Sequence, residues 1–358
     1  MRRGSVTIKD VAEAAGVHTS TGSRALSPAT RHQISDEIAR RIDGVAKELG
    51  YTRNAIASSL RTRRSMTVGV LIPDITNPLF PPMLRGIEDA LGSEFTAIIA
   101  NTDNDPEREA LGARRLLARS VDGLILATIR RRGGVAEELV ASGVPVVLVN
   151  RTADRGEWSS VVADDAQGIR LMVEHLAGLG HLRIAHLAGP LELSTGAVRQ
   201  RAFREAMRAH HLDADEQRVT VARAYSIAEG ARLADQLLRT KPAPTAILTA
   251  NDLLALGAYE AASALGHGIP ADLSVTGYND MPFVDRLTPP LTTVRIQHYE
   301  MGAQATRLLL QRLERPDAPA MSVQLGVQLV VRGSTAPPAR AAISADKAAW
   351  RPDTDDAL

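Results

Sequence analysis

The sequence contains no cysteine and few aromatic residues, which make up 3% of its 358 residues. The absence of cysteine excludes disulfides, thiolate metal sites and cysteine nucleophiles. No run approaches the roughly 18 consecutive apolar residues of a membrane-spanning helix, and the N-terminus has no apolar signal core. We therefore expect a cytoplasmic protein that makes no contact with a membrane.

The sequence motifs of common enzyme classes are also missing. His175, His181 and His186 fall on different predicted elements and do not form the i, i+4 pair of a zinc protease. The nearest match to a dinucleotide-binding motif, at residues 178–180, ends a helix and precedes a strand, which is the reverse of the required order. There is no GxSxG motif and no phosphate-binding P-loop. We expect no enzymatic activity, no metal site and no cofactor.

The first 50 residues carry the pattern of three short helices. Thr7 is a plausible N-cap with Asp10 three residues later. Gly16 ends this helix after about two turns, and a second short helix follows Val17 and runs to about Leu26. A third begins at the cap Ser35 and ends at Gly50. Two short helices joined by a tight turn and packed on a third are typical of a helix-turn-helix domain.

The charge distribution agrees with this interpretation. Residues 1–64 contain twelve Lys/Arg and six Asp/Glu, a net charge of +6, whereas the whole chain carries +1. Neutralisation of phosphates supplies most non-specific affinity for DNA, so a basic module on a mildly acidic body indicates DNA binding.

From Thr67 onward, short apolar runs alternate with amphipathic helices. This pattern predicts a parallel, doubly wound sheet and repeats in a second half of similar length. The predicted strands are 67–74, 95–101, 121–128, 144–151, 183–189, 245–251 and 273–280. Two such halves suggest two subdomains facing one another across a cleft. The stretch after Pro337 is rich in Ala, Pro and Asp without periodicity, which predicts disorder at 337–358.

The segments TIKDVAEAAGV, STGSRAL, ELGYTRNAIASSLR and VGVLIPDITNP together resemble the LacI/GalR family of bacterial transcription regulators. The resemblance runs from about Val6 to Gly333. It implies an α/β protein with an N-terminal helix-turn-helix head and a two-subdomain, doubly wound, periplasmic-binding-protein-like body. The expected parts are a head (1–52), a hinge helix and linker (53–65) and a body (66–336). Within the body, the resemblance implies that 66–162 pair with 292–320 and 163–291 with 321–336, with crossings near Val162, Leu291 and Met321.

The resemblance also implies which residues of the head contact DNA. The positions that would read bases in the major groove are Thr19, Ser20 and Arg24, and those that would contact phosphate are Thr7, Thr21 and Ser23. Arginine can bond bidentately to guanine, and hydroxyl side chains can contact base edges. Helix capping is the alternative role for Thr19 and Ser20.

Residues 54–60 match the hinge helix of the family. Asn54 can cap it, and Leu60 matches the residue that wedges between base pairs in the minor groove. A helix of about six residues does not hold alone in water, so it should form only against its twin and DNA. Packing of Leu60 against a neighbouring helix is the alternative.

The head departs from the family pattern at three places. Gly22 stands where Val is usual, His18 replaces the usual Ser cap, and the loop 27–33 is about two residues longer. Glycine in a helix interior costs about 1 kcal/mol relative to alanine. We therefore expect a less stable head, and we expect Gly22→Val to raise its melting temperature.

In sheets of this kind, ligands bind beyond the carboxyl ends of the strands. Those ends are 74–80, 101–105, 150–151, 190–199, 225, 251–252 and 279–280. Within them, the resemblance implies the effector-binding residues Leu79, Phe80, Asn150, Thr195, Arg199, Tyr225, Asn251 and Asn279. A guanidinium can hold two adjacent oxygens, so Arg199→Ala is expected to abolish the ligand response and spare operator binding. Capping of the following helix is the alternative for Asn251.

Together these features predict a transcriptional regulator, most simply a repressor. Its partners would be double-stranded operator DNA and a small-molecule effector, a sugar or sugar derivative. It would act as a homodimer, and a tetramer is also compatible with the sequence. Leu193 stands where purine-responsive relatives have Arg, which argues against a purine. The rival interpretations are a regulator controlled by a protein partner and a solute-binding protein without a DNA role.

Overall fold

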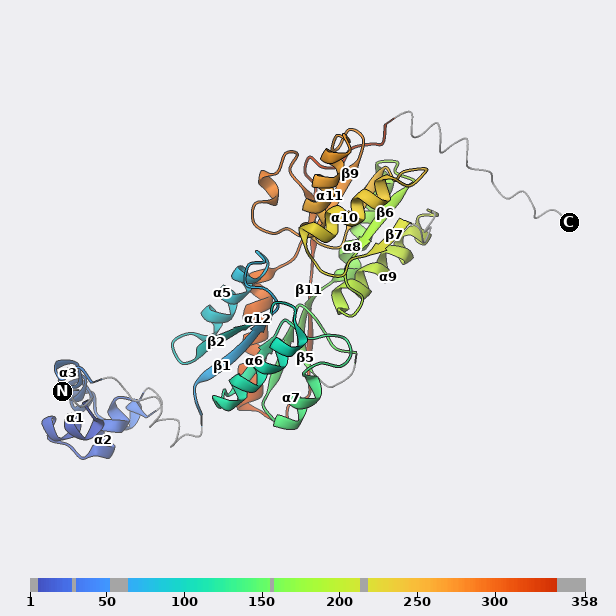
Figure 1. Cartoon of the computed structure of the whole chain (residues 1–358). Helices are drawn as coiled ribbons and strands as arrows, with labels where there is room; N and C mark the ends of the chain where they lie inside the picture. The colour runs from blue at the N-terminus through green and yellow to red at the C-terminus, as the bar shows by residue number, and fades with distance from the viewer. Residues whose placement is uncertain (1–5, 28–29, 52–63, 155–157, 213–217, 340–358) are drawn as a thin grey trace. The chain divides into compact units, whose positions relative to one another are not determined.

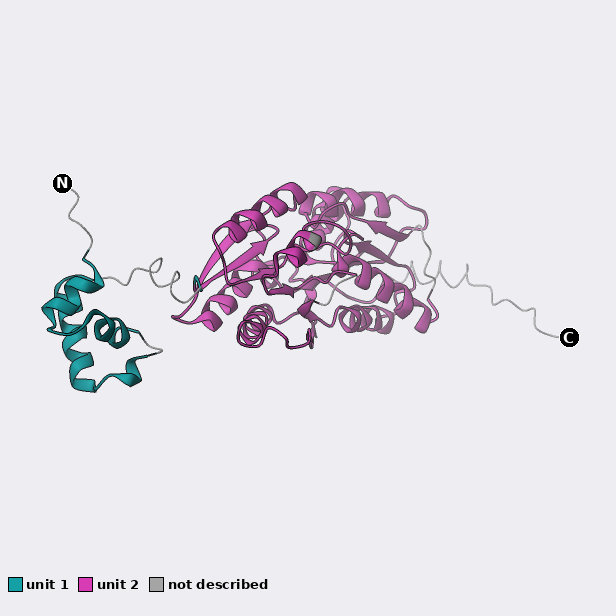
Figure 2. Cartoon of the chain, turned by 90° about the horizontal axis from the view of Figure 1, so that it is seen from below, with its two compact units in different colours: residues 1–65 teal, residues 66–358 magenta. Residues whose placement is uncertain are grey.

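The computed structural model describes residues 6–27, 30–51, 64–154, 158–212 and 218–339. The chain divides into two units, Met1–Ser65 and Met66–Leu358, which Figure 2 colours separately and which we call the head and the body. The predicted hinge, with Asn54 and Leu60, lies outside the described residues, as do residues 340–358 of the predicted disordered tail.

The head consists of three α-helices and one turn of 3-10 helix. These are α1 (Ile8–Ala14), α2 (Thr19–Ala25), η1 (Arg31–Gln33) and α3 (Asp36–Glu48). The predicted capping box is present, because Thr7 N donates to Asp10 Oδ2 over 2.7 Å and Asp10 N donates to Thr7 Oγ1 over 3.4 Å. Ser35 holds the N-cap position of α3 but makes no side-chain cap hydrogen bond.

The turn between α1 and α2 is the tight turn that the sequence predicted. Gly16 adopts φ +63°, and Val17 N donates to the Ala12 carbonyl over 2.9 Å, the bond that closes a helix C-terminus of this type. The helices pack around a small apolar core that includes Val11, Ala39 and Ile42. The three-helix arrangement of the head is therefore confirmed.

The body contains two six-stranded sheets. The first has the order β11-β5-β4-β3-β1-β2 and the second the order β12-β10-β9-β8-β6-β7. All described strand pairs are parallel except β10 with β12. The first sheet is built from β1 (Thr67–Ile72), β2 (Thr96–Asn101), β3 (Gly123–Leu126), β4 (Val146–Val149), β5 (Ser159–Ala163) and β11 (Ser322–Leu325). The second is built from β6 (Ile184–Ala188), β7 (Val219–Val221), β8 (Ala246–Thr249), β9 (Ser274–Asn279), β10 (Thr292–Arg295) and β12 (Gln328–Val330).

Helices accompany both sheets, and Figure 1 shows the two resulting halves of the body. We call them the first half and the second half. The helices of the first half are α5 (Phe80–Leu91), α6 (Pro106–Ala118), α7 (Ala136–Ser142) and α12 (His298–Glu314). Those of the second half are α8 (Asp165–Gly178), α9 (Ser194–Ala209), α10 (Ile227–Leu238), α11 (Asp252–Ala264) and the short η3 (Val284–Arg286). No helix in the described ranges is long and apolar enough to span a membrane.

The chain crosses between the halves at positions that differ from two of the predicted ones. Strand β10 belongs to the second sheet and β11 to the first, so the later crossings follow Arg295 and Leu325 rather than Leu291 and Met321. Consequently 292–295 belong with the second half, and 321–325 with the first. The prediction failed because a four-residue strand next to a crossing has no signal in the sequence that tells which sheet it joins.

Helix α12 comes late in the chain yet packs against α5 of the first half (Figure 1). The two helices approach at Gly86 and Gly302, where an added Cβ would overlap the backbone of the facing helix. This close contact ties the C-terminal part of the chain to the first sheet.

Candidate functional site

Helix α2 carries the polar surface that the sequence assigned to DNA. The side chains of Ser20 and Arg24 are exposed, and those of Thr19, Thr21 and Ser23 are half-buried. Thr7, which is exposed, uses its hydroxyl in the capping box of α1. Ser20 and Arg24 are four residues apart and therefore lie on one face of the helix.

His18, rather than Thr19 or Ser20, occupies the N-cap of α2. Its Nδ1 accepts from Ser20 N over 3.3 Å and lies 2.8 Å from Ser20 Oγ. A histidine ring therefore replaces a serine hydroxyl in satisfying the first turn. His18 therefore keeps the N-terminus of α2 capped, which weakens the expectation of a less stable head.

Gly22 is buried at the contact between α1 and α2. A Cβ added there would lie 3.3 Å from the Cβ of Ala12 and 3.7 Å from Ile8 Cδ1. A side chain at position 22 would press against Ala12 unless α1 shifts by a few tenths of an ångström. The structure therefore argues against the expected stabilisation by Gly22→Val.

A pocket lies between the two halves of the body, with an empty volume of about 480 Å³ that includes space open to solvent. Its walls come from the segments that follow β1, β2, β3 and β4 on one side and β6 and β7 on the other. This is the strand-end position expected for a ligand in such sheets. The lining residues are Pro73, Thr102, Asn104, Asp105, Glu109, Thr128, Arg130, Arg151, Pro190, Glu192, Leu193, Arg223, Ala224 and Tyr225.

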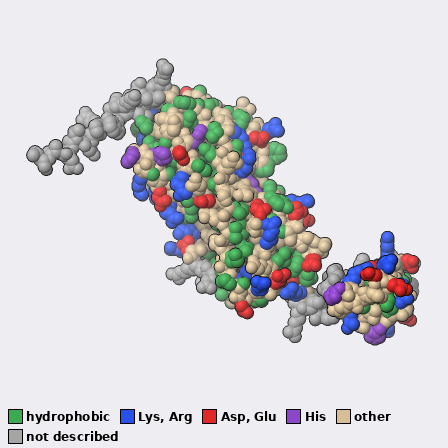
Figure 3. All heavy atoms as spheres, turned by 180° about the vertical axis from the view of Figure 1, so that it is seen from behind, with side chains coloured by type: hydrophobic (Ala, Val, Ile, Leu, Met, Phe, Trp, Pro, Cys, Tyr) green, Lys and Arg blue, Asp and Glu red, His purple; other side chains and the backbone are tan. Residues whose placement is uncertain are grey.

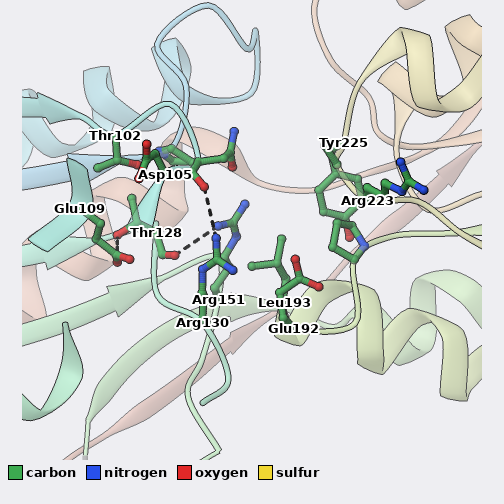
Figure 4. Close-up of a pocket in the computed structure, with 14 residues that line it drawn as sticks. Thr102, Asp105, Glu109, Thr128, Arg130, Arg151, Glu192, Leu193, Arg223 and Tyr225 are labelled. Atoms are coloured by element: carbon green, nitrogen blue, oxygen red, sulfur yellow. Dashed lines mark hydrogen bonds between the residues drawn. The ribbon is translucent and has the colours of Figure 1, made fainter. Parts of the chain in front are cut away.

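The two walls carry different chemistry. Figure 4 shows Arg130 and Arg151 extending from the first half toward Glu192 and Leu193, with Tyr225 farther along the second wall. The Arg151 guanidinium is 6% exposed and donates to the Thr128 carbonyl over 3.3 Å. Burial lowers the pKa of Arg151 to about 10, so the group remains protonated at neutral pH.

Tyr225 is the one predicted effector-binding residue that lines this pocket. Its ring packs against Gly189, where any side chain would overlap the phenol. Its hydroxyl lies 3.1 Å from Thr195 Oγ1, which places that second predicted residue immediately behind it. Burial raises the pKa of Tyr225, so its hydroxyl is a neutral donor and acceptor.

Arg199 was the residue that we most expected to contact the ligand. It lies beneath the second wall, and all its guanidinium nitrogens donate hydrogen bonds to other residues of the protein. It is 2% exposed, and its Nε and Nη2 donate to Asp165 Oδ1 over 3.0 and 2.8 Å. Nη1 donates to the Ala250 carbonyl over 2.5 Å, and the guanidinium stacks 3.7 Å from the centroid of Tyr278. Burial opposes the charge, but Asp165 more than offsets it and raises the pKa of Arg199 above its ordinary value.

The other predicted effector residues lie outside the pocket lining. Leu79 and Phe80 are buried in the apolar core at the start of α5. Asn150 is buried after β4 with φ +65°. Asn251 caps α11, accepting from Leu254 N over 2.9 Å, as the alternative interpretation proposed. Asn279, with φ +112°, is buried with its Oδ1 unpaired.

Several lining residues were not predicted. Thr128 and Arg130 follow β3, and Arg223 follows β7, a three-residue strand that the sequence pattern did not reveal. Glu109 sits inside α6, and its Oε1 accepts from Thr128 Oγ1 over 2.6 Å. The strand-end rule would have found Thr128 and Arg130 if the loop after β3 had been considered. Among the described residues, no cluster of three or more His, Asp or Glu side chains could hold a metal ion.

Two family models match the chain. Residues 7–54 match the family of bacterial regulatory proteins of the lacI type, and residues 173–335 match a periplasmic binding protein-like domain. The ribose operon repressor of Halalkalibacterium halodurans is 33% identical over 330 residues, which span 92% of this chain and 97% of that protein. The regulator DegA of Bacillus subtilis is 34% identical over 337 residues, which span 92% and 98%.

Solved structures give the same picture. The lac repressor dimer bound to operator and an anti-inducer superimposes with a TM-score of 0.80 at 29% identity, covering 93% of this chain and 99% of that one. A regulator from Enterococcus faecium with bound ribose superimposes with a TM-score of 0.67 at 31% identity, covering 76% and 100%. With its helix-turn-helix head and its two-sheet body, this chain belongs to the LacI family of DNA-binding, effector-responsive transcriptional regulators.

Proposed function

We propose that the protein is a repressor that binds operator DNA as a homodimer and changes its operator affinity when a sugar or sugar derivative enters the body pocket. The observation that carries the proposal is the exposed face of α2. Ser20 and Arg24 point to solvent from a helix whose other side is fixed against α1 and α3. Such a face suits base edges in a major groove.

The second element of the proposal is the homodimer. Strand β2 is the edge of the first sheet, and apolar side chains beside it remain exposed, Ile75 at 51%, Ile99 at 44% and Leu111 at 45%. An edge strand flanked by exposed apolar side chains favours pairing with another chain. A twofold dimer would present two heads to a pseudo-palindromic site.

The third element is the ligand response. The pocket is lined by hydroxyl, carboxylate and guanidinium groups around the ring of Tyr225, a combination suited to a hydroxylated ring. A ligand that binds one arrangement of the two halves better than the other shifts the body toward that arrangement. This difference in affinity sets the upper limit on how far the ligand can change operator affinity.

The DNA role is tested with the full-length protein. An operator is selected from a random pool of duplexes, and its affinity is measured by fluorescence anisotropy at fixed salt. Arg24→Ala should cost about 1–3 kcal/mol of discrimination against the changed base. Arg24→Lys is the matched control, because it keeps the charge and loses the bidentate fork. Unchanged base preference in both variants would contradict the proposed role of α2.

The ligand role is tested by thermal stabilisation over a library of sugars, sugar acids and polyols. A hit that also changes operator affinity supports the proposal. Intact operator binding without a hit across the library would favour control by a protein partner.

A further inference from the structure

Two guanidinium groups, those of Arg130 and Arg151, extend into the pocket from the first half (Figure 4). Arg223 lines the pocket from the second half, but its guanidinium extends away from them, beyond Tyr225. Within the described ranges, neither Arg130 nor Arg151 forms an ion pair, and Arg130 donates to the Asn104 carbonyl over 3.2 Å. Arg151 is the more informative of the two, because its Nε is buried and has no hydrogen-bond partner.

Ion pairing is common elsewhere on the body, which makes this arrangement informative. Arg131 and Arg132, which directly follow Arg130, both pair with Asp154, over 2.9 and 3.2 Å. On the face shown in Figure 3, basic and acidic side chains are interspersed over the surface. A cation that is 94% buried and unpaired costs free energy unless another group compensates it.

Two of the three acids that line the pocket are hydrogen-bonded within its walls. Glu109, which is 3% exposed, accepts a hydrogen bond from the Thr128 hydroxyl over 2.6 Å. Asp105 caps α6 by accepting from Glu107 N over 2.8 Å. Glu192 is exposed, and with Glu109 it acts on Arg151 only through space. Arg151 Nε is therefore a buried donor that none of these acids satisfies.

We propose that the effector is an anionic sugar derivative whose carboxylate or phosphate group is held by Arg151 together with Arg130. This inference rests on the proposed function and names the class of its ligand. A planar guanidinium matches the two oxygens of either group and forms short, charge-assisted hydrogen bonds. The ring of Tyr225 would cover the apolar face of the carbon skeleton.

A neutral sugar fits this arrangement less well. Its hydroxyl groups can accept from Arg151 Nε, but they bring no charge to offset the buried cation. An anion supplies both the acceptor and the charge in one group. Hydrogen bonds to charged groups contribute roughly 1.5–3 kcal/mol, so an anionic ligand should bind at least about tenfold tighter than its neutral parent.

The test measures the melting temperature of the full-length protein with matched probes at constant ionic strength. The probes are inorganic phosphate, gluconate, glucose 6-phosphate and ribose 5-phosphate, with glucose and ribose as neutral parents and chloride as the salt control. At least one organic anion should stabilise the protein at a concentration about tenfold below that needed by its parent.

Two substitutions locate the effect. Arg151→Met removes the buried charge and should raise the melting temperature without ligand while abolishing the response to the anion. Arg130→Ala removes the second guanidinium, on a half-buried side chain, and should weaken the anion response several-fold. Arg132→Ala, at a guanidinium that is 84% exposed and already paired with Asp154, should leave the response unchanged.

The inference is overturned if a neutral parent stabilises as well as its anion, or if no anion stabilises the protein. It is also overturned if the response persists in full in Arg151→Met and Arg130→Ala. Operator binding, measured in parallel, separates this failure from failure of the proposed function. A neutral sugar that shifts operator affinity would keep the proposed function and reject the anionic ligand.

Discussion

The backbone nitrogen of Arg131 donates a 2.9 Å hydrogen bond to the backbone carbonyl of Glu192, joining the first half of the body to the second. The Arg131 guanidinium adds a bond of 3.2 Å to the Leu191 carbonyl and is held in place by its ion pair with Asp154. These contacts lie next to Arg130 and Glu192, which line the pocket. They hold the two halves together in the arrangement that the structure records.

Arg131→Ala should therefore weaken ligand binding without touching the ligand. Loss of the side-chain contacts costs about 1 kcal/mol, and it depopulates the arrangement in which Arg131 joins the two halves. The apparent dissociation constant, measured by calorimetry, should rise about fivefold. Arg132→Ala is the control, because Arg132 pairs with the same Asp154 while its side chain is 84% exposed. Equal effects of the two substitutions would show that Asp154, and not the contact with Leu191, carries the effect.

Gly22 offers a second prediction, in the opposite direction to the one drawn from the sequence. Gly22→Val should lower the melting temperature of the head, because its Cβ would sit 3.3 Å from Ala12 and its methyl groups would separate α1 from α2. Overpacking of this kind typically costs about 1–3 kcal/mol.

The measurement is calorimetry on the full-length protein, in which the head transition is identified by its shift on addition of operator DNA. Gly22→Ala separates the two effects of a side chain here. Alanine gains about 1 kcal/mol of helix propensity over glycine and adds only the tight Cβ contact. It should therefore be close to neutral. A clear stabilisation by Gly22→Val would restore the expectation from the sequence.

The elements of the fold were predictable because each long strand and helix has its own apolar pattern. Strands such as β1 and β9 are continuous buried runs, and Gly16 marks the turn of the head by its positive φ. The short strands β10 and β11 were misassigned because sheet membership depends on partners distant in the sequence.

The pocket was predicted less well than the fold. The strand-end rule located Arg151 and Glu192, since it needs only the ends of predicted strands, and the resemblance to the family supplied Tyr225. It could not show that Asp165, 34 residues before Arg199, neutralises that arginine beneath the wall. A residue type that suits a ligand suits a buried partner equally, and only the packing decides between them.

Arg199 gives the third prediction. Arg199→Met should destabilise the body by about 3–5 kcal/mol, because it leaves the Asp165 carboxylate buried without its partner. Chemical unfolding followed by circular dichroism measures this loss. The double variant Arg199→Met/Asp165→Asn removes both charges and should recover more than half of it. A single variant of unchanged stability that no longer responds to ligand would instead support direct contact between Arg199 and the effector.

The fourth prediction concerns pH and rests on Asp252, which is fully buried at the start of α11. Its carboxylate accepts from Met281 N over 2.8 Å and from Thr293 Oγ1 over 2.6 Å. Burial raises its pKa from 3.8 to about 7, with a smaller contribution from the nearby Asp280. Between these two pH values the folded protein holds a proton that the unfolded chain releases. The contribution of Asp252 to stability therefore falls as the pH rises from about 4 to 7 and stays low above 7.

Asp252→Asn should remove this decline. An asparagine can accept from Met281 N through its oxygen and donate to the Thr293 hydroxyl through its nitrogen, so both bonds survive. The variant should gain stability relative to the wild type as the pH rises from 5 to 8, by at most about 3 kcal/mol. Urea unfolding at the two pH values measures the gain as a difference, in which the titration of the histidines cancels. Asp235→Asn, at an exposed carboxylate whose pKa Arg239 lowers, should give no such gain. An Asp252→Asn variant that follows the wild type at both pH values would mean that the buried carboxylate is already ionised at pH 5.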